Sequence, residues 1–140
     1  MNKPAENQAL ALRLPPHSVE AEASILGGLL LDNAAWERIA DVVRAEDFYR
    51  ADHRIVFEVI ARLIDASKPA DVVTVFEALE GLGRANEVGG IAYLNTLAQE
   101  TPSAANIVRY AEIVRDRAIL RFLVSVSDQI ATQALNPAGK

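Results

Sequence analysis

Residues 103–135 read SAANIVRYAEIVRDRAILRFLVSVSDQIATQAL, and they contain neither glycine nor proline. Pro102 precedes this stretch, and Ser103 is the predicted N-cap of a helix that fills it. Asn136-Pro137 ends the helix, because proline lacks an amide donor and its ring clashes with the preceding turn. A single helix of this length would be roughly 50 Å long, which exceeds the width of a small domain.

The two halves of this predicted helix differ in their apolar pattern. The first half has one apolar stripe at helical spacing, formed by Ile107, Ala111, Val114 and Ala118. The second half has a wider apolar surface, formed by Ile119, Leu120, Phe122, Leu123, Val124, Val126 and Ile130. Such a surface needs cover from another segment or another molecule. We therefore predict that the first half closes a globular core and that the second half contacts a partner helix or subunit.

The composition is that of an ordinary globular protein. The chain has 140 residues, of which 51% are hydrophobic and 24% are charged. It has no cysteine, which excludes disulfides, a thiolate nucleophile and cysteine metal sites, and which fits a cytoplasmic location. No apolar run approaches the ~20 residues of a membrane span, and the first residues lack the pattern of a secretory signal. The net charge of −5 disfavours tight binding to duplex DNA, since such domains usually carry a basic face.

The remaining sequence predicts an all-α fold, with about five shorter helices before the long one. Residues 1–14 are predicted to be a flexible arm, and residues 15–102 a globular helical domain. Residues 103–135 are the long helix, and residues 136–140 are a hairpin turn or a truncated linker. The only β-branched pair that could suggest a strand, Val72-Val73, is too short to predict one.

Several residues are predicted to start or shape the shorter helices. Ser18 caps the first helix, and Glu20 and Glu22 oppose the positive end of its dipole. Gly27-Gly28 within this helix indicates a close approach to another helix. Asp52 is expected to open a later helix. A further helix is predicted to begin with either Asp71 or Thr74 as its cap.

The sequence contains no recognisable catalytic, cofactor-binding or metal-binding motif. It lacks the phosphate-binding pattern G-x-x-x-x-G-K-[ST], and the glycines between Gly81 and Gly90 do not match a dinucleotide fingerprint. His17 and His53 lie in separate segments without a spacing typical of metal ligands. No nucleophile is accompanied by a base and an orienting group, so we expect a chain that catalyses nothing by itself.

Four arginines of the long helix admit several interpretations. They are Arg109, Arg115, Arg117 and Arg121. Glu112 and Asp116 alternate with them, and Glu112 is expected to pair with Arg115. The arginines could form a solvated face or a charged rim beside an apolar interface. The alternative function is an all-α dimeric nucleic-acid-binding module, which would use them as a recognition surface.

Four blocks of the sequence resemble the N-terminal domain of bacterial replicative DNA helicases of the DnaB type. They are PPHSVEAEASILGGLLLDN (residues 15–33), DFYRADHRIVFEVIARL (47–63), KPADVVTV (68–75) and VGGIAYLNTLAQETPSAANIVRYAEIVRDRAILR (88–121). The resemblance extends over residues 14–140. It implies a domain that is followed, in the parent helicase, by a motor domain with the ATP and Mg²⁺ site. The parent would be an ATP-dependent helicase that moves 5′ to 3′.

The resemblance also implies partners. In this family the N-terminal domains pair through a helical hairpin and form a collar, a trimer of dimers, which docks the helicase-binding domain of primase. Residues 103–135 resemble the first arm of that hairpin. Our predicted interface residues are Arg117, Ile119, Leu120, Arg121, Phe122, Leu123, Val126 and Ile130. Asp128 joins the two arginines as a possible polar rim, and Phe122 could instead belong to the core.

Overall fold

The computed structural model describes residues 14–137, which form six α-helices and no strand. The helices are α2 (Val19–Leu31), α3 (Trp36–Ile39), α4 (Ala51–Asp65), α5 (Val72–Gly81), α6 (Gly90–Glu100) and α7 (Ile107–Leu135). Three 3-10 turns connect them: η1 (Asn33–Ala35), η2 (Ala45–Asp47) and η3 (Ala85–Val88). The all-α prediction, with five shorter helices and one long helix, is confirmed. Most of the predicted arm at residues 1–14, and residues 138–140, lie outside the described residues.

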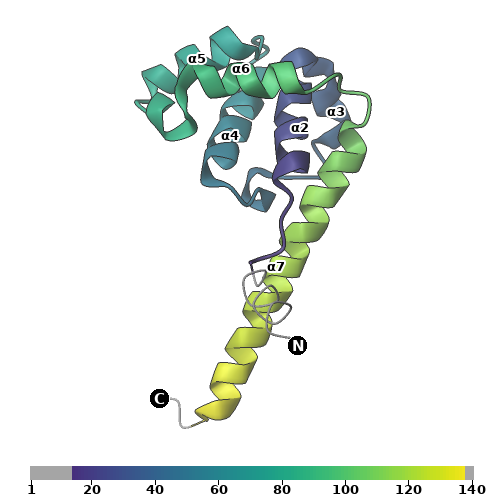
Figure 1. Cartoon of the computed structure of the whole chain (residues 1–140), viewed down its shortest axis with the longest axis vertical. Helices are drawn as coiled ribbons and strands as arrows, with labels where there is room; N and C mark the ends of the chain where they lie inside the picture. Colours follow the sequence, from purple (N-terminus) through teal and green to yellow (C-terminus); the bar gives the residue numbers. More distant parts are fainter. Residues whose placement is uncertain (1–13, 138–140) are drawn as a thin grey trace, which may run out of the picture.

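The described helices form a head and a shaft (Figure 1). Helices α2 to α6 make the head, and α7 runs beside α2 and α3 before it extends well beyond them. Contacts between α7 and the head involve α2, α3 and η2. Only the first half of α7 therefore packs against the head.

Helix α2 is the centre of the head, because it packs against α4, α6 and α7. Its fully buried side chains include Ile25, Leu26 and Leu29. A Cβ atom on Gly27 would overlap the Thr101 hydroxyl and the Leu97 carbonyl at the end of α6. The predicted close helix approach at Gly27-Gly28 is thus confirmed.

Two predicted helix caps are confirmed. The Ser18 hydroxyl accepts a hydrogen bond from the backbone N–H of Ala21 at 3.2 Å, at the start of α2. The Asp71 carboxylate accepts one from the backbone N–H of Thr74 at 2.9 Å, and the Thr74 hydroxyl accepts one from the N–H of Asp71 at 2.8 Å. This reciprocal capping box starts α5, so both residues that we considered contribute to it.

Two other predicted helix starts are wrong. Helix α4 begins at Ala51, and Asp52 lies inside its first turn, where its carboxylate binds the Arg50 guanidinium. Helix α7 begins at Ile107, four residues later than predicted from Ser103. The Ser103 hydroxyl instead accepts from the N–H of Ala105 at 3.2 Å, because a serine can stabilise a turn as readily as a helix start.

Candidate protein interface

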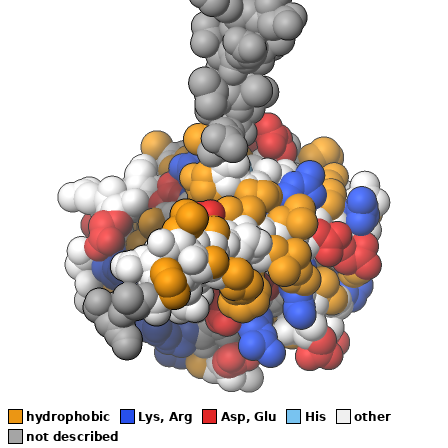
Figure 2. Space-filling model, turned by 90° about the horizontal axis from the view of Figure 1, so that it is seen from below, with side chains coloured by type: hydrophobic (Ala, Val, Ile, Leu, Met, Phe, Trp, Pro, Cys, Tyr) orange, Lys and Arg blue, Asp and Glu red, His pale blue; other side chains and the backbone are white. Residues whose placement is uncertain are grey.

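The outer half of α7 exposes large apolar side chains. These are Ile119, Leu120, Phe122, Leu123, Val124, Ile130 and Leu135, while Val126 is half-buried. Phe122 is 67% exposed, so the alternative that it belongs to the core is wrong. Figure 2 views the molecule from the side of the C-terminal end of α7, and hydrophobic side chains gather in the middle of that face. The sequence pattern had placed this surface correctly.

The apolar side of α7 changes direction along the helix. Ile107, Ala111 and Val114 are buried against the head. Residues 18 apart lie almost in line after about five turns, so Ser125 continues the line of Ile107 with a polar side chain. Ile130 likewise continues the line of the exposed Glu112 with an apolar side chain. The outer half therefore points its apolar side away from the direction in which the inner half contacts the head.

Four of the outer apolar residues form a continuous seam, which we call the α7 seam. Its members are Ile119, Leu123, Val126 and Ile130. Their spacing of four, three and four residues is that of the core positions of a coiled coil. Phe122 and Leu120 flank it and widen the apolar face. This arrangement suits the packing of a second helix along α7.

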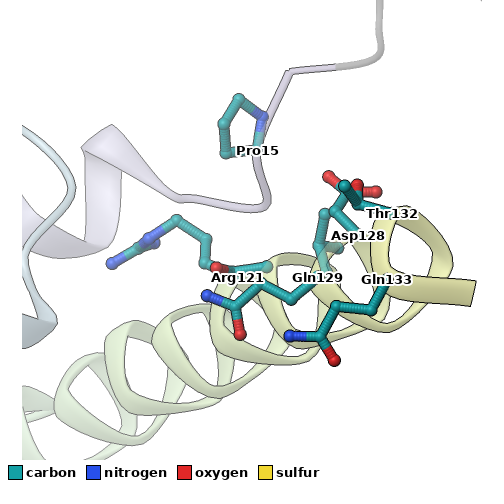
Figure 3. Close-up of a pocket in the computed structure, with 8 residues that line it drawn as sticks. Pro15, Arg121, Asp128, Gln129, Thr132 and Gln133 are labelled. Atoms are coloured by element: carbon teal, nitrogen blue, oxygen red, sulfur yellow. The ribbon is translucent and has the colours of Figure 1, made fainter. Parts of the chain in front are cut away.

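A groove lies on the other side of the outer half (Figure 3). Its lining combines the segment before α2 with α7, and comprises Pro15, Arg121, Val124, Ser125, Asp128, Gln129, Thr132 and Gln133. Asp128, which we proposed as part of a rim, faces this groove together with Thr132.

Arg121 is directed into the head of its own chain. Its guanidinium donates hydrogen bonds of 2.7 Å to the carbonyl oxygens of Pro16 and Asp47. It also lies over the ring of Tyr49, 5.4 Å from the ring centroid. Arg117, the other predicted rim arginine, is half-buried on the same helix. Whether either residue also contacts a partner stays a prediction.

The four arginines of α7 do not share one surface. Arg109 pairs with Glu112 at 3.5 Å, and Arg115 donates to the carbonyl oxygen of Val42 at 3.3 Å. The expected pair between Glu112 and Arg115 is therefore wrong, because Arg115 reaches toward the head instead. Since Arg121 also points to the head, these side chains do not form the exposed basic face that a recognition helix requires.

A buried polar cluster lies within the head, and the sequence analysis missed it. The Glu22 carboxylate is 2.7 Å from Nδ1 of His53, and Nε2 of His53 is 2.7 Å from the Tyr93 hydroxyl. Glu22 also accepts hydrogen bonds from the backbone N–H groups of Tyr49, at 2.6 Å, and Arg50, at 3.4 Å. Burial raises the pKa of the Tyr93 hydroxyl. The cluster joins three segments of the head.

The sequence did contain a signal for this cluster. Glu22 lies three residues after Val19 and four before Leu26, so it occupies the apolar stripe of α2. A carboxylate at such a position must find partners in the core. His17 lies elsewhere, with its ring stacked on Tyr49 at 4.3 Å between centroids. The two histidines are therefore not brought together.

The described residues offer neither a metal site nor a membrane-spanning helix. Residues 14–137 contain no group of three or more His, Asp or Glu side chains that could hold a metal ion. None of the helices in the same range is both long enough and apolar enough to cross a membrane. The exposed face of α7 is thus the most distinctive candidate site in the described part of the chain.

Comparison with known protein families agrees with this fold. Residues 14–116 match the family described as the DnaB-like helicase N terminal domain. The chain belongs to this family. The DnaB-type relatives include the replicative DNA helicase DnaB of Haemophilus influenzae, which is 44% identical over 138 residues, or 99% of this chain. The replicative DNA helicase DnaB of Pasteurella multocida is 48% identical over 126 residues, or 90% of this chain.

Solved structures of DnaB N-terminal domains have the same fold. That of the Mycobacterium tuberculosis DnaB helicase is 38% identical, with a TM-score of 0.85 over 88% of this chain and 85% of its own. That of Helicobacter pylori, which was described together with its interactions with primase, is 22% identical. It has a TM-score of 0.69 and covers 97% of this chain and all of its own, and this likeness concerns the fold alone.

The chain spans less than a third of its DnaB relatives. It covers 30% of the Haemophilus influenzae protein and 27% of the Pasteurella multocida protein. The matching part is the N-terminal domain, so the helicase activity of those proteins is not assigned to this chain by the match.

Proposed function

We propose that this chain is the non-catalytic collar domain of a replicative hexameric DNA helicase. In this role it pairs with a second copy, contributes to hexamer assembly and docks primase during DNA replication. Its membership of the DnaB-like N-terminal domain family supports this role. The ATP and Mg²⁺ chemistry of the parent helicase would belong to a separate motor domain, and the parent would act in the cytoplasm.

The observation that carries the proposal is the exposed apolar face of α7. Leu123 is 53% exposed and Ile130 is 63% exposed, and both belong to the α7 seam. Burying such side chains against a second copy would contribute about 25 cal/mol per Å² of apolar area, before the entropy of association is subtracted. The apolar term therefore supports the pairing of two α7 helices.

The primase part of the proposal draws on relatives. The Helicobacter pylori domain was described with its interactions with primase. Its fold matches 97% of this chain, although the two sequences are only 22% identical. We propose the helicase-binding domain of primase as a partner. Adding that domain to this chain should give a heavier species in light scattering, and two unchanged separate species would contradict it.

Leu123→Asp tests the pairing. The substitution places a charge in the centre of the α7 seam, where a paired helix would have to desolvate it. We expect sedimentation of a concentration series to show weakened self-association, while the helical content measured by circular dichroism stays near that of the parent chain. Gln129→Asp is the matched control, because it adds the same carboxylate at an exposed position in the groove on the other side of α7. Equal masses for the parent chain and Leu123→Asp would contradict the proposal.

A further inference from the structure

The side chain of Arg121 connects three parts of the chain that are far apart in sequence. Its two terminal nitrogens donate hydrogen bonds of 2.7 Å to the carbonyl oxygens of Pro16, before α2, and Asp47, at the end of η2. Its guanidinium also lies over the ring of Tyr49. We call these four residues the Arg121 clasp. The guanidinium of arginine is planar and holds its N–H donors in fixed directions, so it can bond to both carbonyl oxygens and lie over the ring at the same time.

The ring of Tyr49 is itself held in place. His17 stacks on it, with 4.3 Å between ring centroids and 20° between ring planes. The backbone N–H of Tyr49 donates to the buried Glu22 carboxylate at 2.6 Å. The surface that receives Arg121 is therefore tied both to the core of the head and to the segment that leads into α2.

The clasp lies at the point where α7 leaves the head. The last fully buried side chain of α7 is Val114, and Ala118 is half-buried. Among the described residues, hydrogen bonds from α7 to the head come from Arg115 and Arg121, and those of Arg121 lie farther out. Figure 3 shows Arg121 extended beneath the segment that runs from Pro15 into α2.

We propose that Arg121 is a positioning residue that fixes the direction of the outer half of α7 relative to the head. The inference rests on the proposed function, because a fixed direction matters when the α7 seam must meet a second copy. In a two-fold dimer both copies have the same angle between the head and α7, so a change in that angle displaces the α7 seam of each copy from the interface. The clasp thus presents the seam in an orientation that is ready for pairing.

Distance measurements between two spin labels test the first part of this proposal. The sequence has no cysteine, so Glu58→Cys on α4 and Gln133→Cys on the outer half of α7 give two specific labelling positions. Dilution with unlabelled chain restricts the signal to distances within one molecule. We expect Arg121→Met to broaden the distance distribution and to move its maximum, because both carbonyl contacts are lost.

Arg117→Met is the matched control, since it removes an arginine one turn away on the same helix. It should leave the distance distribution unchanged. An unchanged distribution in Arg121→Met, or equal broadening in both variants, would overturn the proposal. If Arg121→Met does not fold, Arg121→Lys serves instead, because it keeps the charge and the aliphatic stem but loses the planar fork; it should broaden the distribution, and an unchanged one would overturn the proposal.

Sedimentation of the unlabelled variants tests the second part. If Arg121→Met leaves only about one tenth of the molecules in the clasped orientation, and both copies must be clasped to pair, the apparent Kd of self-association should rise about a hundredfold. A broadened distance distribution with an unchanged Kd would overturn the role of the clasp in pairing. Failure of the parent chain to self-associate would count against the proposed function, whereas the distances would still test the clasp within one molecule.

Discussion

Glu22 shows how one buried carboxylate can organise the head. It is 1% exposed, and it accepts hydrogen bonds from two backbone N–H groups at the start of α4, those of Tyr49 and Arg50. Helix α4 has no capping hydrogen bond from the side chain of its own N-cap, Arg50. Glu22 lies on α2 but stabilises the start of α4, and it also bonds to the His53 side chain of α4. These bonds together fix the position of α2 relative to α4.

Glu22→Ala should destabilise the chain by about 2–5 kcal/mol, because it leaves the ring of His53 and two amides without their buried acceptor. The free energy of unfolding in urea measures this loss. Glu20→Ala is the control, since Glu20 lies in the same turn of α2 but is exposed. Its effect should be within about 0.5 kcal/mol. Similar small losses for both variants would show that the buried cluster contributes little.

Single residues could be predicted from the sequence where their partners are neighbours in the chain. Ser18 and Asp71 were placed correctly as caps, because each bonds to an amide three residues later. Glu22 was assigned to the helix dipole, although its main partners are 27 to 31 residues away. Ser103 and Asp52 were misassigned because such side chains can stabilise several local conformations, among which only the fold selects.

At the scale of elements, the start of α5 should give stability that depends on pH. The hydrogen bond from the backbone N–H of Thr74 lowers the pKa of the Asp71 carboxyl below its ordinary value. A carboxyl with a lowered pKa in the folded state stabilises that state above the pKa of the unfolded chain, near 3.9 for aspartate. This contribution is lost as the pH falls through the lower, folded value.

We therefore expect Asp71→Ala to reduce the free energy of unfolding by about 1 kcal/mol at neutral pH, the usual loss for an N-cap. The difference between the two chains should shrink as the pH falls below about 4, because the parent chain then loses the charged cap that the variant lacks at every pH. Urea unfolding of both chains at a series of pH values measures this difference in the free energy of unfolding. Glu77→Ala, on the exposed side of α5, should show no such change. A difference that stays constant down to acid pH would contradict this assignment.

The outer half of α7 should be stable only when it is covered. Isolated helices shorter than about 12–15 residues are marginal in water, and residues 122–135 contain no buried side chain. We expect their amide hydrogens to exchange faster than those of residues 107–118 in dilute solution, and to become protected at high protein concentration. Leu123→Asp is the control and should keep fast exchange at both concentrations. Slow exchange that does not depend on concentration would contradict the prediction.

The sequence predicted the two halves of α7 because helical spacing is a local pattern. The spacing of apolar residues also indicates where Arg121 lies. Arg121 follows Val114 by seven residues and Ala118 by three, so it lies on the side of α7 that faces the head. The pattern does not predict the hydrogen-bond partners of Arg121, because the carbonyl groups of Pro16 and Asp47 come close to it only in the folded molecule.

At the scale of the whole molecule, the head and the outer half of α7 have different requirements. The head buries its apolar side chains within one chain, and α7 contributes Ile107, Ala111 and Val114 to that core. The outer half contributes apolar side chains that the described residues of this chain leave exposed. The two parts should therefore be separable: one provides the fold, and the other provides the association.

A chain shortened to residues 1–121 tests this separation. It keeps the three buried residues of α7 and the Arg121 clasp, and it removes the exposed side chains from Phe122 onward. We expect its free energy of unfolding to fall by no more than about 1 kcal/mol, because exposed residues contribute little. It should sediment as a monomer at concentrations at which the full chain pairs. A chain that ends at residue 106 is the control and should fail to fold, because it lacks the contribution of α7 to the core. Unfolding of the 1–121 chain, or its undiminished pairing, would show that the head and the outer half are not independent.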